Sequence, residues 1–302
     1  MTVTGPDQVR FFAAVVVDGV LAGAIYALIA LAFVVVYKAS HIINFALGEW
    51  MMLGSRLAAT GMYPLGLGLA GALGAACAGM VALAVVWNRV VLQRLVGQPL
   101  IGMIMITIGF GALVRGAAAL SFRGIPGAVP LPFPQEPLSL LGVAVPADRL
   151  AAAAVATVAI AAVAWFFRGS RTGLALRAIA DDSQAAMAVG IDIDRHFSIT
   201  WALVGVLCVL AGTLWTSVSG GGFGVVLLGL KVFPIVIIGG LDSIPGTIVG
   251  AVLVGVLESL AAGYLDPLLG GGFSTIAAYL VLVAMLFVRP SGLLGHPPVE
   301  RV

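Results

Sequence analysis

The sequence consists of long apolar runs separated by short polar stretches. The main runs cover approximately residues 11–37, 64–88, 99–122, 150–167, 197–218, 246–264 and 272–288. A helix of about 20 apolar residues spans the hydrocarbon core of a bilayer, and a helix satisfies its own backbone groups there. Charged residues make up only 9% of the chain, against about 25% in soluble domains. These features predict an all-α integral membrane protein and exclude a soluble domain.

Two further apolar segments are short or interrupted. Residues 43–54 carry Glu49 near their middle, and residues 229–241 are interrupted by Pro234 and a pair of glycines. Paired interrupted segments in the two halves of a transporter are typical of an internal repeat and of a translocation path. We therefore expect about eight transmembrane helices together with two short or broken membrane segments.

The polar stretch at residues 168–196 sets the expected orientation. Lys and Arg are enriched in cytoplasmic loops, so this basic and acidic stretch is placed in the cytoplasm. The proline-rich residues 123–147 then form an outer loop, because prolines cannot continue a helix. The sequence predicts a single transmembrane domain over residues 1–302, with its N-terminus outside and its C-terminus in the cytoplasm.

Ionisable residues inside apolar runs are costly and usually face a bundle interior or a cavity. Glu49 is such a residue, and Asn44 is placed to cap a helix that begins at Phe45. Two interpretations remain open: Asn44 and Glu49 line or gate a path, or Glu49 only fixes helix packing. Glu258 is expected to form a structural contact between helices. The residues expected along the path are Asn44, Phe45, Leu47, Glu49 and Pro234.

Motifs for ATP binding, metal binding and catalysis are missing from the sequence. Neither Lys38 nor Lys231 belongs to a GxxxxGK[ST] loop, so the chain should not bind ATP itself. The two cysteines lie in apolar runs, and the 3 histidines are scattered. A net charge of +2 does not indicate nucleic-acid binding. We predict no enzyme activity, no metal and no cofactor.

The polar stretch also predicts a short helix. Asp182 or Ser183 can cap its start, residues 184–189 suit a helix, and Gly190 can end it in the left-handed conformation. So short a helix is marginal alone, which favours docking into a groove of a soluble partner. The alternative is a helix lying on lipid headgroups, which usually uses bulky apolar and basic side chains. The expected docking residues are Asp182, Ser183, Ala185, Ala186, Met187 and Gly190.

Four stretches together resemble the LivH-type branched-chain amino acid permeases of ABC importers. They are residues 26–54, 173–192, 229–258 and 289–295, in the family's order and spread over nearly the whole chain. One departure is Leu47, where the family usually has a histidine. Because family members also carry amides, urea and organic acids, this departure leaves the substrate open.

The resemblance implies a permease subunit in the bacterial cytoplasmic (inner) membrane. Such a subunit pairs with a second homologous permease, which is LivM-like, and two ATPase subunits dock on the loop at residues 168–196. A periplasmic or lipid-anchored binding protein delivers the solute. That solute would be a small polar or amphipathic molecule, such as a branched-chain or hydrophobic amino acid, a related amide or an organic acid.

Two other functions compete with this interpretation. A self-sufficient channel or secondary transporter would move solute without partner subunits, but it has no need of a structured cytoplasmic helix. A membrane scaffold gains little from charges in lipid, so Asn44, Glu49 and Glu258 argue against it. Solute flux through the reconstituted chain alone would favour the channel or secondary transporter.

Overall fold

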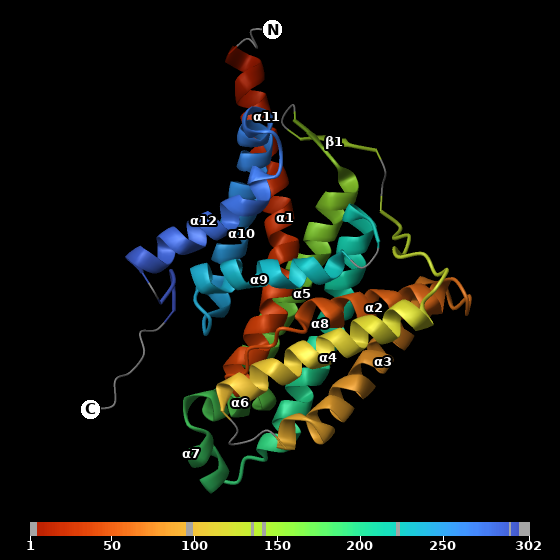
Figure 1. Ribbon diagram of the computed structural model, residues 1–302, viewed down its shortest axis with the longest axis vertical. Coiled ribbons are helices and arrows are strands. Elements are labelled where there is room, and N and C mark those ends of the chain that lie inside the picture. Colours follow the sequence, from red (N-terminus) through yellow and green to blue (C-terminus); the bar gives the residue numbers. More distant parts are fainter. Residues whose placement is uncertain are drawn as a thin grey trace. The chain divides into compact units, whose positions relative to one another are not determined.

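The computed structural model describes residues 5–94, 99–133, 136–140, 143–221, 224–289 and 291–295, which are helical nearly throughout (Figure 1). The elements in chain order are α1 (Gly5–Ser40), α2 (Leu47–Met62), α3 (Gly68–Val90), η1 (Leu92–Arg94), α4 (Leu100–Ser121), β1 (Leu138–Leu140), β2 (Val143–Val145), α5 (Ala147–Gly169), α6 (Arg171–Asp181), α7 (Ser183–Ala188), α8 (Ile193–Ser219), α9 (Val225–Gly239), α10 (Ile244–Leu260), η2 (Ala261–Leu265), α11 (Asp266–Leu269) and α12 (Phe273–Val288).

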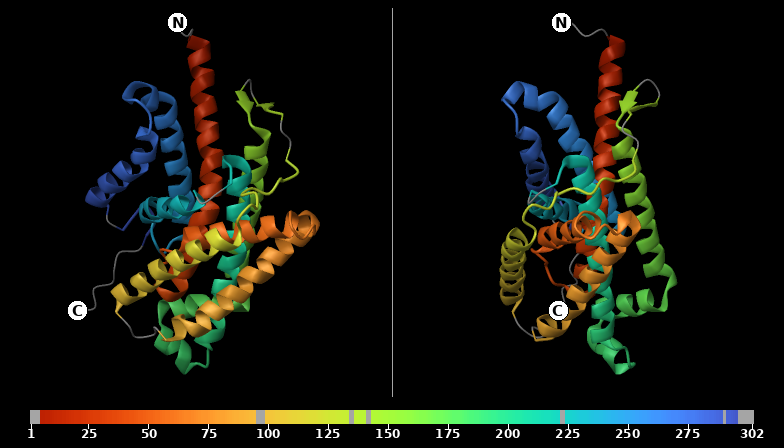
Figure 2. Two further views of the ribbon diagram at one scale, coloured as in Figure 1. Left: turned by 45° about the vertical axis from the view of Figure 1, so that its right-hand side comes forward. Right: turned by 90° about the vertical axis from the view of Figure 1, so that its right-hand side faces the viewer.

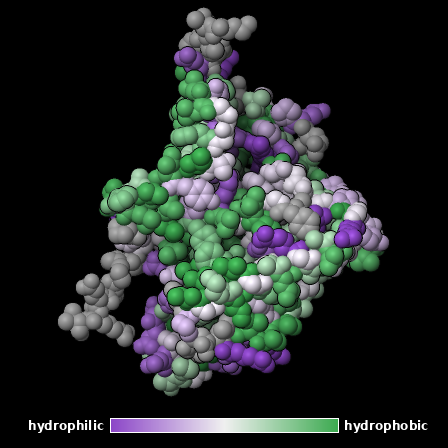
Figure 3. Space-filling view, in the orientation of Figure 1, coloured by the Kyte–Doolittle hydropathy of each residue, from purple (hydrophilic) through white to green (hydrophobic). Residues whose placement is uncertain are grey.

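The length and hydrophobicity of these helices confirm a multi-pass membrane protein of the all-α class. Within the described part of the chain, 6 helices can cross a membrane: Gln8–Ser40, Gly68–Arg94, Ile101–Ser121, Ala147–Gly169, Ile193–Ser219 and Ile244–Leu269. Helices α9 and α12 are apolar but shorter. Hydrophobic residues cover much of the visible surface over α12 and along α4 (Figure 3), as expected where helices face lipid. The count of about eight crossings stays a prediction.

The chain divides into two compact units. The first unit contains residues 1–31, 132–158 and 231–302, and the second contains residues 32–131 and 159–230. The division falls inside α1, α5 and α9, so each of these helices contributes to both units.

In the second unit, α2 packs against α3, α4 and α8, and α3 packs against α8 (Figures 1 and 2). Each of these four helices contributes one aromatic ring to a central cluster of Trp50, Trp87, Phe110 and Trp201. The ring centroids of Trp87 and Phe110 are 4.0 Å apart, and those of Trp50 and Trp201 are 5.4 Å apart. Since aromatic rings bury large apolar areas, this cluster places α2 at the core of the unit.

In the first unit, glycines allow α1 to approach α10 closely. A Cβ at Gly19 would lie 2.6 Å from the Cα of Val256, and one at Gly23 would lie 2.7 Å from the Cα of Val252. On α10, a Cβ at Gly255 would lie 2.8 Å from the Cα of Gly23. The spacing of Gly19 and Gly23 matches the small-residue pattern that brings membrane helices together.

Several boundaries differ from the sequence-based expectations. The segment expected at residues 43–54 continues as α2 to Met62, because its buried face extends along the helix. The segment at residues 229–241 is not interrupted at Pro234, which lies inside α9. Prolines are tolerated in membrane helices where neighbouring groups satisfy the freed backbone. Helix α9 ends instead at Gly239, followed by Gly240 with a φ of 111°.

The proline-rich stretch contains a small hairpin that the sequence did not predict. Strands β1 and β2 pair antiparallel, with Leu138 opposite Val145 and Leu140 opposite Val143. The alternation of apolar and small residues here spans only 3 residues in each strand. The six prolines around it indicate an irregular loop more strongly than so short an alternation indicates a strand. The hairpin therefore could not be predicted from the sequence.

Candidate functional site: a charged pocket, a buried polar network and an exposed short helix

A pocket of about 760 Å³ lies in the second unit, against α2, α4 and the first turns of α9. Its lining is mostly apolar or small and contains one acid and one base. The lining residues are Phe45, Glu49, Ile108, Gly111, Ala112, Arg115, Gly116, Ala119, Val226, Leu227 and Leu230. A cavity of this size and composition falls in the range of small-molecule sites, which are about 300–1,000 Å³ and mainly apolar with few polar groups.

Glu49 and Arg115 form an ion pair at the wall of this pocket. The guanidinium Nη2 of Arg115 donates to the Oε1 of Glu49. The Glu49 side chain is only 6% exposed, whereas the Arg115 side chain is 53% exposed. Within the described ranges, Arg115 is the sole hydrogen-bond partner of the Glu49 carboxylate. The pair therefore joins a buried negative charge to a cation on a half-exposed side chain.

Close backbone approaches place this ion pair. A Cβ at Gly111 on α4 would lie 3.0 Å from the Cδ of Glu49, so a larger residue there would crowd the carboxylate. On the other side, a Cβ at Gly229 on α9 would lie 2.5 Å from the backbone nitrogen of Gly48. Glycines on both neighbouring helices thus bring α4 and α9 against the start of α2, where Glu49 occupies the first turn.

The structure brings together only part of the predicted path. Phe45 and Glu49 line the pocket, whereas Asn44 and Leu47 are each 1% exposed and absent from its described lining. The Oδ1 of Asn44 accepts from the backbone N–H of Ala46, at 3.0 Å. Helix α2 begins at Leu47 and not at the expected Phe45, because Asn44 closes a turn before the helix. Pro234 belongs to the first unit.

Arg115 is the one ionisable residue among the described pocket residues that was not predicted from the sequence. It had a detectable signal, because it lies inside the apolar run at residues 99–122, where an unpaired cation is unfavourable. Glu49 is an acid inside another apolar segment. Two opposite charges in separate apolar helices could have been matched as partners, although sequence alone offers other pairings.

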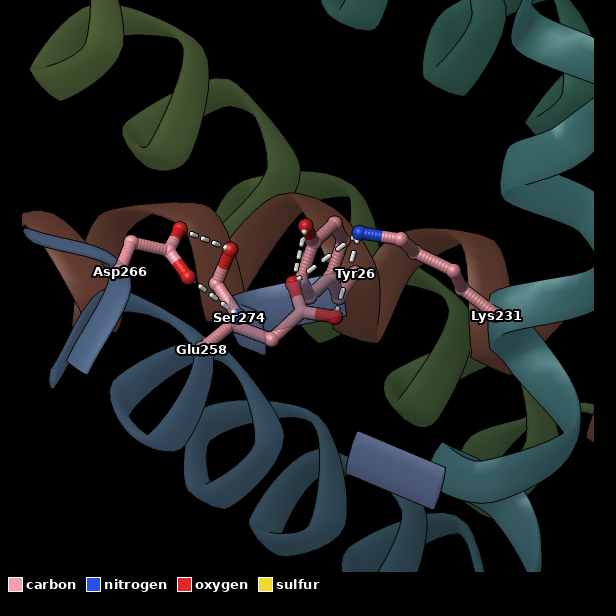
Figure 4. A network of polar contacts seen from close by, with 5 residues as sticks. All are labelled: Tyr26, Lys231, Glu258, Asp266 and Ser274. Atoms are coloured by element: carbon pink, nitrogen blue, oxygen red, sulfur yellow. Dashed lines mark hydrogen bonds and ion pairs between the residues drawn. The ribbon is translucent and has the colours of Figure 1, made fainter. Parts of the chain in front are cut away.

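A second polar site lies in the first unit, around Glu258. The Tyr26 hydroxyl donates to the Oε2 of Glu258 at 2.8 Å, and the Lys231 Nζ donates to the same oxygen at 3.2 Å. Figure 4 shows Tyr26 and Lys231 converging on this carboxylate from α1 and α9. A nearby contact joins the Ser274 hydroxyl to the Asp266 carboxylate at 2.8 Å. Glu258 thus links three helices, and a structural role for it stays a prediction.

The predicted short helix is present as α7 in the second unit. Asp182 is its N-cap, and its Oδ1 accepts from the backbone N–H of Gln184 at 2.9 Å. Gly190, with a φ of 87°, follows the helix in the left-handed conformation. Met187 is 54% exposed, whereas Ala186 is only 3% exposed. Ala186 therefore supports the packing of this segment, whereas Met187 and the more exposed Val189 offer apolar contacts.

The side chains that could ligate a metal ion are scattered over the described part of the chain. Within them, no group of three or more His, Cys, Asp or Glu side chains is placed to hold a metal ion. Cys77 and Cys208 are both free thiols. The chemistry that the structure does offer consists of an ion pair in an apolar pocket, a buried carboxylate between helices and an exposed short helix.

Comparison with known proteins gives matches over nearly the whole chain. High-affinity branched-chain amino acid transport system permease protein LivH of Escherichia coli K12 is 29% identical over 314 residues, covering 98% of this chain and 99% of the relative. Permease protein BraD of Pseudomonas aeruginosa is 30% identical over 303 residues, covering 95% of this chain and 96% of the relative. A probable LivH of Methanocaldococcus jannaschii is 30% identical over 135 residues, or 42% of this chain and 41% of the relative.

The family model described as "Branched-chain amino acid transport system / permease component" matches residues 15–289. This match includes the ion pair of Glu49 and Arg115, the Glu258 network and α7. The chain therefore belongs to the family of permease components of branched-chain amino acid transport systems.

Proposed function

We propose that this chain is the permease subunit of an ATP-driven importer for branched-chain or other hydrophobic amino acids. The observation that carries the proposal is the family match over residues 15–289, which takes in both compact units. LivH and BraD are named as branched-chain amino acid transport permeases and align with 98% and 95% of this chain. The multi-pass helical fold suits a translocation role in a bacterial cytoplasmic membrane.

The proposal includes partners, because the sequence has no ATP-binding loop. A second permease subunit would complete the path, two ATPase subunits would dock at α7, and a binding protein would deliver the amino acid. The exposure of Met187 supports α7 as the docking element, since an exposed apolar side chain on a short capped helix suits a groove. ATP-dependent motion at such a contact would then bias the permease between its states.

Uptake of radiolabelled L-leucine tests this function. Cells in which the gene is deleted should lose most of their high-affinity uptake, and a wild-type copy should restore it. Depleting ATP should stop uptake, whereas collapsing the proton gradient with ATP maintained should not. The chain reconstituted alone in liposomes should give no flux. Uptake that follows the proton gradient, or flux through the chain alone, would support a secondary transporter or channel and refute this proposal.

A further inference from the structure

We propose that the pocket of Glu49 and Arg115 binds the zwitterionic head of an α-amino acid whose side chain is apolar. This inference rests on the proposed function and deepens it, because it places a transient substrate site on the permease itself. The Arg115 guanidinium would bind the carboxylate of the ligand, and the Glu49 carboxylate would bind its ammonium group.

The charges of the pocket match those of a zwitterion. Among its described lining residues, Glu49 and Arg115 are the only two ionisable groups, with opposite signs. An α-amino acid carries one negative and one positive group on a single carbon. Burying either charge without a partner is costly, so a site holding only one charge would favour an acid or an amine. A site with one charge of each sign compensates both ligand charges and keeps the total neutral.

Both side chains keep bonding capacity beyond their mutual contact. Arg115 donates one described hydrogen bond, from Nη2 to Glu49, and a guanidinium has five N–H donors in a planar fork. That fork suits bidentate binding of a carboxylate. A carboxylate accepts at about four positions, and the one described hydrogen bond to Glu49 ends on Oε1. A zwitterion can thus bind beside the ion pair without breaking it.

The exposure of Arg115 also needs an explanation that a purely structural ion pair does not give. Arg115 lies in the candidate membrane span Ile101–Ser121, yet 53% of its side chain is exposed. Cations in membrane segments usually face a cavity or a substrate path, because lipid does not solvate them. Here Arg115 is one of the residues that line the pocket.

The remaining walls suit an apolar side chain. Ile108, Leu227 and Leu230 line the pocket, and small residues at Ala112, Gly116 and Ala119 leave room between them. The volume of about 760 Å³ accommodates a leucine-sized ligand together with water. Shape and polarity therefore favour neutral amino acids with aliphatic side chains over amino acids that carry a third charge.

Binding to the purified chain tests this inference without any partner subunit. The full-length protein in lipid nanodiscs is titrated with radiolabelled L-leucine, which is then displaced by L-leucine, N-acetyl-L-leucine or L-leucinamide. The two derivatives each lack one charge. Each is expected to compete at least about tenfold more weakly than L-leucine, because a hydrogen-bonded charge loses its partner. Equal competition by all three compounds would contradict a zwitterion site.

A double substitution separates binding from structural support. In Glu49→Gln/Arg115→Met, both charges are removed together, a change that is often neutral for stability because no charge is left unpaired. We expect an unchanged thermal transition and elution profile but a loss of L-leucine binding of at least about tenfold. A stable double variant that binds L-leucine as well as wild type would overturn the proposal.

A steric variant provides an independent check if the double variant does not fold. Gly116 lines the pocket, and a Cβ there would meet nothing within 4 Å, so Gly116→Leu should project into the cavity. Gly109 lies on the same helix, also has open space at its Cβ and is not among the described lining residues. Gly116→Leu should weaken binding at least about tenfold, while Gly109→Leu should not. Equal binding by both variants would contradict the site.

The two proposals fail in different ways. If deletion of the gene leaves L-leucine uptake unchanged, or if uptake follows the proton gradient, the proposed function is wrong. If wild-type uptake is normal but the pocket variants bind and transport L-leucine like wild type, only the zwitterion site is wrong.

Discussion

At the scale of single residues, the described part of each unit contains a buried carboxylate that is paired with a cation. In the second unit Glu49 is paired with Arg115, and in the first unit Glu258 is paired with Lys231 at 3.1 Å. The pairs differ in exposure: the Arg115 side chain is 53% exposed and the Lys231 side chain 26%. Glu258 is also bonded to Tyr26, which adds a neutral donor. The Glu258 pair is therefore better suited to holding helices together than to receiving a ligand.

Lys231→Met should destabilise the protein because it leaves the Glu258 carboxylate with only the Tyr26 hydroxyl as a described partner. The expected loss is about 1–3 kcal/mol, the typical cost of leaving a buried polar group without its partner. The thermal transition of the detergent-solubilised protein measures this effect.

The double variant Lys231→Met/Glu258→Gln serves as the control for this prediction. Because it removes both charges, it should recover much of the lost stability. If the single and double variants unfold at the same temperature, the ion pair does not contribute as described.

At the scale of helices, close packing depends on glycines whose replacement would push backbones apart. Gly23 on α1 is such a position, since a Cβ there would lie 2.7 Å from the Cα of Val252. The side chain of Ser259 adds a bond across the same pair of helices, donating to the carbonyl of Val15 at 2.8 Å. Interhelical bonds and small residues together are typical of tightly associated membrane helices.

Gly23→Leu should sharply reduce the yield of folded protein, because neither backbone can move without opening the α1–α10 contact. Gly74→Leu on α3 is the matched control, because a Cβ at Gly74 meets nothing within 4 Å. Size-exclusion chromatography of the extracted protein measures the folded fraction. Similar profiles for the two variants would contradict the close approach of α1 and α10.

Helix α7 supports a prediction about coupling. Met187→Glu places a charge on the exposed apolar surface, so it should lower ATP-dependent leucine uptake strongly while the chain still inserts. Met187→Leu keeps the apolar contact and should retain uptake. Membrane abundance of each variant, measured by immunoblotting, separates lost coupling from lost protein. Wild-type uptake with Met187→Glu would argue against docking through this side chain.

At the scale of the whole molecule, the number of membrane crossings determines whether the two termini lie on the same side of the membrane. Termini on opposite sides require an odd number of full crossings, so eight crossings and opposite termini cannot both hold. The described chain has 6 long candidate spans and the two shorter apolar helices α9 and α12. Helix α2, with 16 residues and a mostly buried surface, is a further element whose crossing would change an even number of crossings to an odd one.

Cysteine accessibility tests the orientation that we propose. The two native cysteines are replaced by alanine, and a single cysteine is introduced at Gln184 or Ser139, which are exposed on α7 and β1. A membrane-impermeant maleimide should label Ser139→Cys in intact cells, and Gln184→Cys only after the inner membrane is permeabilised. Labelling of both positions in intact cells would place α7 outside and contradict the proposed topology.

The sequence by itself determined that the chain lies in a lipid bilayer and that its fold is all-helical. Runs of apolar residues long enough to span a bilayer leave helices as the only self-sufficient structure, and the described chain is helical nearly throughout. Local chemistry also determined α7, since Asp182 and Gly190 act on backbone groups within a few residues. The continuation of α9 through Pro234 depends on packing and was not predicted. The start of α2 at Leu47 was not predicted either, although its cause is local, because the Asn44 side chain closes a turn before the helix.

Only the tertiary structure decided which polar groups meet. Glu49 and Arg115 are 66 residues apart, and Tyr26 and Glu258 are 232 apart, so no local pattern specifies either pair. The pocket depends further on where backbones approach, as at Gly111 beside Glu49. Hydrophobic burial is non-directional, so it sends helices into a bilayer without choosing their neighbours. Close contacts at glycines and buried charge pairs determine which helices become neighbours. These contacts form only when the helices pack.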